Sequence, residues 1–221
     1  MNHLLEAWEL LMQAETWSGP GGMGVRAREH LLYTVAAVGI SALIALPAGL
    51  AVGHFGRGRS LAVLSTGAVR ALPTLGVVTL VGLVVGVGLL APMVALIILA
   101  VPSILAGTYS GVESVDPRVV EAARAQGMNR WQILFTVQIP LGLPLIIGGL
   151  RLAVLQVVGT AMLAAYVGAG GLGAPLFLGL RTYDYPLLVA ASLVVVALAV
   201  LLDIAFGAVQ RTARRRMRGH I

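Results

Sequence analysis

The run ALPTLGVVTLVGLVVGVGLLAPMVALIILAVPSILAGTYSGV, residues 71–112, contains no charged residue. An ionised side chain at the centre of a bilayer costs roughly 3 kcal/mol, and a spanning helix needs about 20 apolar residues. The run is therefore long enough for two membrane helices, with a turn near Gly86, Gly88 and Pro92. This stretch predicts an integral membrane protein built from helices.

The rest of the sequence agrees with this prediction. The chain has 221 residues, of which 58% are hydrophobic and only 11% charged, and its mean hydropathy is +0.94. A soluble domain carries about a quarter charged residues. No Cys is present, which excludes disulfides and thiolate metal sites. With the other charge-poor runs, the pattern predicts five spanning helices, at roughly 31–53, 72–89, 92–111, 143–166 and 186–208.

The distribution of arginine predicts the orientation. All basic residues are Arg, and five of them follow the last span in the segment RTARRRMRGHI, residues 211–221. Cytoplasmic segments carry the excess of basic residues. We therefore expect an extracytoplasmic segment 1–30 whose first 17 residues form a short interfacial helix, a transmembrane domain 31–208 and a basic cytoplasmic tail 209–221. Five spans then place the N-terminus outside and the loop 114–131 inside.

The cytoplasmic segment GVESVDPRVVEAARAQGMNRWQILFTVQIP, residues 111–140, is too elaborate for a plain connection. Asp116 before Pro117 is a helix start, and Gly127 is typical of a helix end. Asn129 with Gln132 three residues later indicates a second start. Two short helices joined by a glycine turn suggest a surface built for docking. A helix lying on lipid headgroups is the alternative from spacing alone.

The sequence of this segment resembles the EAA loop of permeases of bacterial ABC importers. The signature is carried by Glu121-Ala122-Ala123, Gly127, Val137, Ile139 and Pro140. The resemblance implies an all-α type I importer permease in the bacterial inner membrane, with a coupling helix that seats on a cytoplasmic ATPase subunit. The contact residues would then be Glu121, Ala122, Ala123, Arg124, Gly127 and Arg130. It also implies a second permease copy or sister permease, an extracytoplasmic substrate-binding protein and contact with membrane lipid.

Other segments over residues 70–180 are similar to the osmoprotectant branch, which imports glycine betaine, carnitine or choline. They are Leu72–Leu75, Ser114–Pro117, Arg130–Phe135, Gly149–Arg151 and Gly159–Gly173. The same machinery importing methionine or another amino acid stays open, and a passive channel is the alternative from another class. We expect no catalytic residue and no bound cofactor, because the chain has no Lys for a phosphate-binding loop and ATP would bind the partner subunit.

The remaining motifs have packing or pathway interpretations. The glycines Gly168, Gly170, Gly171 and Gly173 match a dinucleotide pattern but follow an apolar helix, so we expect a tight turn near an outer gate. Tyr109 and Tyr166 are candidates to line the pathway. Arg151 and Asp203 are expected to pair inside the membrane.

Glycines four residues apart, such as Gly107 and Gly111, predict close helix packing. The scattered His residues predict no metal site, and the Arg-rich tail is assigned to lipid, not nucleic acid.

Overall fold

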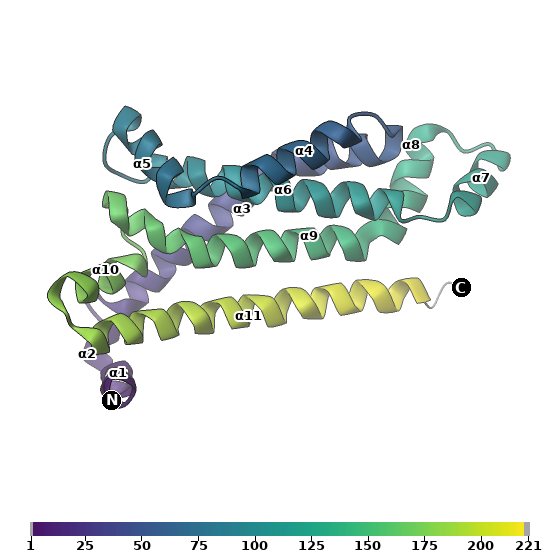
Figure 1. The fold of residues 1–221 in the computed structure, drawn as a ribbon. Coiled ribbons are helices and arrows are strands. Elements are labelled where there is room, and N and C mark those ends of the chain that lie inside the picture. The colour runs from purple at the N-terminus through teal and green to yellow at the C-terminus, as the bar shows by residue number, and fades with distance from the viewer. Residues whose placement is uncertain (1, 219–221) are drawn as a thin grey trace.

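The computed structural model describes residues 2–218, and every regular element among them is helical. Figure 1 shows an elongated bundle in which α6, α9 and α11 run along the same axis. The short helix α7 and the end of α11 lie at one end of the bundle, whereas α1, α2 and α10 lie at the other. The chain therefore places its EAA-like loop and its basic tail at the same end, as the sequence predicts.

Four helical segments are long and apolar enough to cross a membrane, within the residues that the structure describes. They are α3 (Met23–Phe55), α6 (Leu90–Glu113), the run 130–167 and α11 (Tyr185–Arg218). The run 130–167 comprises α8 (Arg130–Gln132), the π-helix η1 (Ile133–Gln138), α9 (Ile139–Thr160) and the 3₁₀-helix η2 (Ala161–Val167).

The expected second span, at 72–89, is wrong in length. Only α5 (Thr74–Val85) forms there, with 12 residues against the roughly 20 that a span needs, and it follows a separate helix, α4 (Arg59–Arg70); both pack on α6. Proline cannot donate a backbone hydrogen bond and disfavours helical geometry at the preceding residue, so the helix breaks at Pro73. At the other end, Gly86 has φ +87° and stops α5 before 89.

The two ends of the chain are more helical than the expected boundaries imply. Helix α3 begins at Met23, so the boundary between 30 and 31 lies inside it, and α11 continues past 209 to Arg218. Residues 219–221 of the expected tail lie outside the described residues. The N-terminal segment forms α1 (His3–Met12) and α2 (Ala14–Trp17). Helix α1 packs on α11 and leaves four large apolar side chains exposed: Leu4, Leu5, Trp8 and Met12.

Helix α6 is the centre of the core and packs on both α3 and α9. Small residues allow the close approach. A Cβ added at Gly107 would lie 2.5 Å from the Cα of Gly149, and one added at Gly111 would lie 2.8 Å from the carbonyl oxygen of Gly142. The glycine pair at 107 and 111 therefore packs helix on helix within the bundle, as its spacing predicts. The adjoining apolar core includes Ala45, Leu96, Ile104, Ala153 and Val157.

Candidate functional site

The EAA-like loop begins with a capped helix, α7 (Pro117–Ala125). The Asp116 carboxylate accepts a hydrogen bond from the amide of Arg118 at 2.9 Å, and Pro117 occupies the first helical position. The helix ends where Gly127 adopts φ +84° and the Met128 amide donates to the Ala123 carbonyl at 3.2 Å. This is a left-handed glycine cap, which only Gly adopts without strain.

A second cap starts the return to the membrane helices. The Gln132 amide donates to Asn129 Oδ1 at 2.9 Å, and the Asn129 amide donates to Gln132 Oε1 at 2.7 Å. The π-helix η1 follows directly and leads to Pro140. Both expected starts and the glycine turn are therefore present, and the loop is ordered by its own side chains.

Helix α7, which carries Glu121, Ala122 and Ala123, lies at one end of the bundle (Figure 1). Ala123 is buried, because α7 turns it toward the rest of the loop. The other five expected contact residues are exposed: Glu121, Ala122, Arg124, Gly127 and Arg130. A carboxylate, two guanidinium groups and small residues from α7, the glycine turn and the start of α8 therefore form one exposed surface.

An aromatic cluster supports this loop from the end of α3. The ring of Phe55 lies 6.2 Å from that of Trp131, and Trp131 lies 6.3 Å from Phe135. Next to them, His54 Nδ1 donates to Gln138 Oε1 at 2.5 Å. Sequence reasoning missed the His54–Gln138 contact. No local signal identifies it, since the two residues lie 84 positions apart.

The glycine-rich segment lies at the opposite end of the bundle and forms a tight turn. Gly168, Gly170 and Gly171 all have positive φ. Space is also limited: a Cβ at Gly170 would lie 2.8 Å from a Glu29 carboxylate oxygen, and a Cβ at Gly173 would lie 2.0 Å from the Met162 carbonyl oxygen. The expected turn is therefore present, and its glycines are needed for conformation and for space.

A row of polar residues on α3 holds this turn. The Glu29 carboxylate accepts from the Gly171 amide at 2.9 Å and from Arg26 at 3.1 Å. The Tyr33 hydroxyl donates to the Ala169 carbonyl at 2.6 Å. The residues on α3 were not identified from the sequence, although their spacing places them on one helix face.

The two candidate pathway tyrosines are not brought together. Tyr109 lies in α6 near the end that leads to α7, whereas Tyr166 lies in η2 near the glycine-rich turn. The Tyr166 ring is half exposed and lies 6.2 Å from the ring of Phe177. They form no shared aromatic site.

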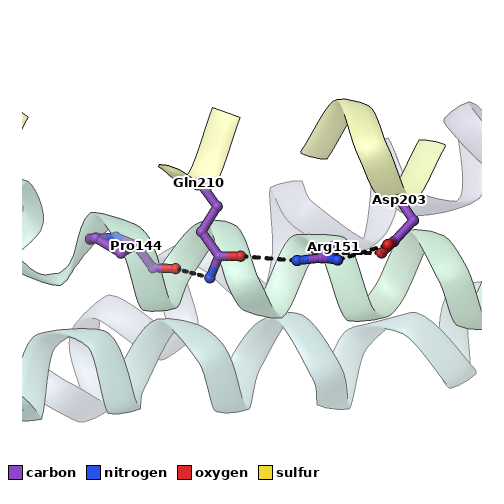
Figure 2. Close-up of polar contacts among 4 residues, drawn as sticks. All are labelled: Pro144, Arg151, Asp203 and Gln210. Carbon is purple, nitrogen blue, oxygen red and sulfur yellow. Dashed lines mark hydrogen bonds and ion pairs between the residues drawn. The ribbon is translucent and has the colours of Figure 1, made fainter. Parts of the chain in front are cut away.

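Arg151 and Asp203 do meet, and they link α9 to α11 (Figure 2). Arg151 Nε and Nη2 each donate to one oxygen of Asp203 at 2.7 Å, which is a bidentate ion pair. Arg151 Nη1 also donates to Gln210 Oε1 at 3.3 Å, and Gln210 Nε2 donates to the Pro144 carbonyl at 2.8 Å. The sequence predicts the charged pair but not the participation of Gln210.

Two hollows flank this polar network. One, of about 520 Å³, lies between α6, α9 and α11, and the other, of about 390 Å³, follows α11 toward its C-terminal end. Arg151, Asp203 and Gln210 line both. The ion pair is therefore accessible from a groove between three of the long apolar helical segments.

Comparison with known proteins agrees with this geometry. Residues 15–219 match the family described as binding-protein-dependent transport system inner membrane component. The chain is 30% identical over 191 residues to the glycine betaine/carnitine/choline transport system permease protein OpuCB of Bacillus subtilis, covering 86% of this chain and 88% of that protein. It is 35% identical over 183 residues to the osmoprotectant import permease protein OsmW of Salmonella typhimurium, covering 79% and 84%.

The fold is also similar to that of a solved transporter. A chain of the inward-facing MetNI methionine ABC transporter superimposes with a TM-score of 0.75, covering 86% of this chain and 96% of that one at 24% identity. At this identity the likeness concerns the fold alone. It is the architecture of an ABC importer permease.

Proposed function

The chain belongs to the family of binding-protein-dependent transport system inner membrane components, and on that premise we propose that it is the permease subunit of an ATP-driven importer of quaternary-amine osmoprotectants. Its relatives of about 30% identity are named as permeases for glycine betaine, carnitine and choline or as an osmoprotectant import permease. The substrate class comes from these names, whereas the transport machinery is supported by the loop itself.

The exposed helix α7 carries the proposal. Its caps fix both ends, Glu121 and Ala122 are exposed on it, and it connects two long helices of the bundle. A helix that transmits a movement from a partner chain must be rigid and must be exposed to that chain. In the proposed mechanism, a separate ATPase chain binds ATP and contacts Glu121 and its neighbours. Its movement shifts α6 and α9, so that the transporter changes between outward-open and inward-open states.

The same proposal specifies the remaining partners and the orientation. The N-terminus lies outside and the basic end of α11 in the cytoplasm, according to the excess of arginine there. A second permease, identical or a sister chain, completes the pathway, and an extracytoplasmic binding protein delivers the solute. ATP would bind the separate ATPase chain. Among the described residues of the permease chain, no group of His, Asp and Glu could hold a metal ion.

The proposal is tested by Glu121→Lys and Gly127→Pro in the complete transporter in proteoliposomes. Proline cannot adopt the φ of +84° found at Gly127, and charge reversal at Glu121 turns an exposed contact repulsive. We expect membrane insertion to be normal and ATP-dependent uptake of glycine betaine to fall at least tenfold. Glu9→Lys, an exposed charge reversal on α1, is the matched control and should transport normally.

The alternatives have distinct outcomes in the same vesicles. Normal uptake by both loop variants would contradict the docking role of α7. Flux without ATP through the unmodified chain would identify a passive channel. Uptake of methionine, with no competition by glycine betaine, would replace the proposed substrate class and keep the machinery.

A further inference from the structure

We propose that the groove beside Arg151 and Asp203 is a weak transit site for zwitterionic quaternary amines. The carboxylate of the solute would bind the Arg151 guanidinium, and its ammonium group would face the Asp203 carboxylate. This inference rests on the proposed function, because it identifies where that substrate class contacts this chain. It assigns a binding role to a pair that would otherwise only join two helices.

The size and walls of the groove fit such a solute. Its volume of about 520 Å³ lies within the range of small-molecule sites, about 300–1,000 Å³. One wall is apolar, with Leu145, Leu152 and Leu155, and glycines of α6 and α9 also line the groove. The methyl groups of a quaternary amine would contact the leucines, while the two charges of the solute would meet the opposite polar wall.

The ion pair is open to the groove and retains binding capacity. The side chains of Arg151 and Asp203 are 33% and 36% exposed within the chain. The guanidinium has five N–H groups, of which three make the contacts described above, so two stay free for a carboxylate. Each Asp203 oxygen accepts one of those bonds and has a further lone pair. Charged groups at membrane depth normally face a cavity or pathway, as these do.

The arrangement favours weak binding, which transit requires. A zwitterion must compete with an ion pair that is already bidentate, and the residues that the structure describes as lining the two hollows include no aromatic side chain to hold the ammonium group. A site on a pathway has to bind well enough to admit a solute and weakly enough to release it. High-affinity capture then belongs to the binding protein.

The second hollow would allow the solute to move along α11 toward its C-terminal end. It shares the ion pair and Gln210 with the first and adds Arg211 and Arg214 of α11. A carboxylate released by Arg151 would therefore have further guanidinium groups near it, toward the C-terminal end of α11. The ion pair thus lies on the boundary that the two hollows share.

A purely structural tie between α9 and α11 is the competing explanation, and solute protection separates the two. Because the natural chain has no Cys, a single Ser110→Cys variant carries the only thiol of the permease, and Ser110 lines the groove. The assembled transporter in nanodiscs would be labelled with a thiol-specific reagent at millimolar glycine betaine. We expect labelling to slow at least threefold, and less with choline, which has the ammonium group but no carboxylate.

Controls make the result specific. Thr212→Cys on α11 is exposed and lines neither hollow, so its labelling should not respond to solute. Adding Arg151→Gln and Asp203→Asn to Ser110→Cys should abolish protection. The same double neutralisation at the ion pair Arg59–Glu113, which lies outside both hollows, should leave it intact.

The outcomes are distinct from those of the proposed function. If the unmodified transporter imports glycine betaine but Ser110→Cys is not protected, the transit site is refuted while the importer stands. Protection that persists without both charges also refutes it. If no quaternary amine is imported at all, the proposed function itself fails. Because protection is measured first with the ion pair intact, the test does not depend on how the neutralised variant folds.

Discussion

Gly107→Ala should destabilise the bundle, because α6 and α9 touch backbone to backbone at this position. The added Cβ would lie 2.5 Å from the Cα of Gly149 and 3.0 Å from the Leu145 carbonyl oxygen. Carbon atoms pack at about 3.5–4.0 Å, so the helices would have to separate by about 1 Å. Overpacking of this kind costs about 1–3 kcal/mol, against which alanine contributes about 0.5–1 kcal/mol of helix preference.

The assay is thermal unfolding of the purified complex in detergent, followed by loss of the monodisperse peak. We expect the apparent Tm to fall by roughly 2–6 °C. Gly39→Ala is the matched control: it lies within α3, and an added Cβ meets no atom within 4 Å. That variant should be neutral or slightly stabilised. Equal Tm values for the two variants would refute the backbone contact between α6 and α9.

Two further substitutions test contacts that join distant parts of the chain. His54→Ala should lower glycine betaine uptake per ATP hydrolysed, because Gln138 loses its hydrogen-bond donor. His54→Asn keeps a donor and should retain the coupling of uptake to ATP hydrolysis. The same uptake per ATP in both variants would contradict a role of this hydrogen bond in coupling. Tyr33→Phe should remove about 1 kcal/mol of local stability, because it deletes the hydrogen bond to the Ala169 carbonyl. Faster amide hydrogen exchange at residues 168–173 would detect this loss. Unchanged exchange there would count against the contact.

The membrane class and the loop could be predicted because their signals are local. Charge-free runs give the spans, and Asp116, Gly127 and Asn129 specify caps through their own side chains and backbone. The pairing of Arg151 with Asp203 could be predicted because charged residues are scarce in these apolar helices. Two opposite charges in the same half of an apolar bundle have few other partners.

The contacts that escaped prediction depend on how helices are placed against one another. Glu29 and Gly171 are separated by 142 positions, and nothing in either segment specifies the other. The shortened second span had a different cause. Pro73 precedes α5, where proline is favourable, but residues 59–70 before it form a separate helix and α5 ends at Gly86 after 12 residues. The helix is therefore shorter than the charge-free sequence allows.

The loop surface and the ion pair belong to one continuous helical run. Residues 130–167 lead from the cap at Asn129 through the π-helix to α9, which carries Arg151. The glycine contacts hold α9 to α6, so the two helices that flank α7 form one packed unit. Helix α11 joins that unit in the described residues through the Arg151–Asp203 pair and the Gln210–Pro144 bond. In the proposed mechanism, a displacement applied at α7 would therefore reach the polar wall of the groove through the packed backbone of α6 and α9.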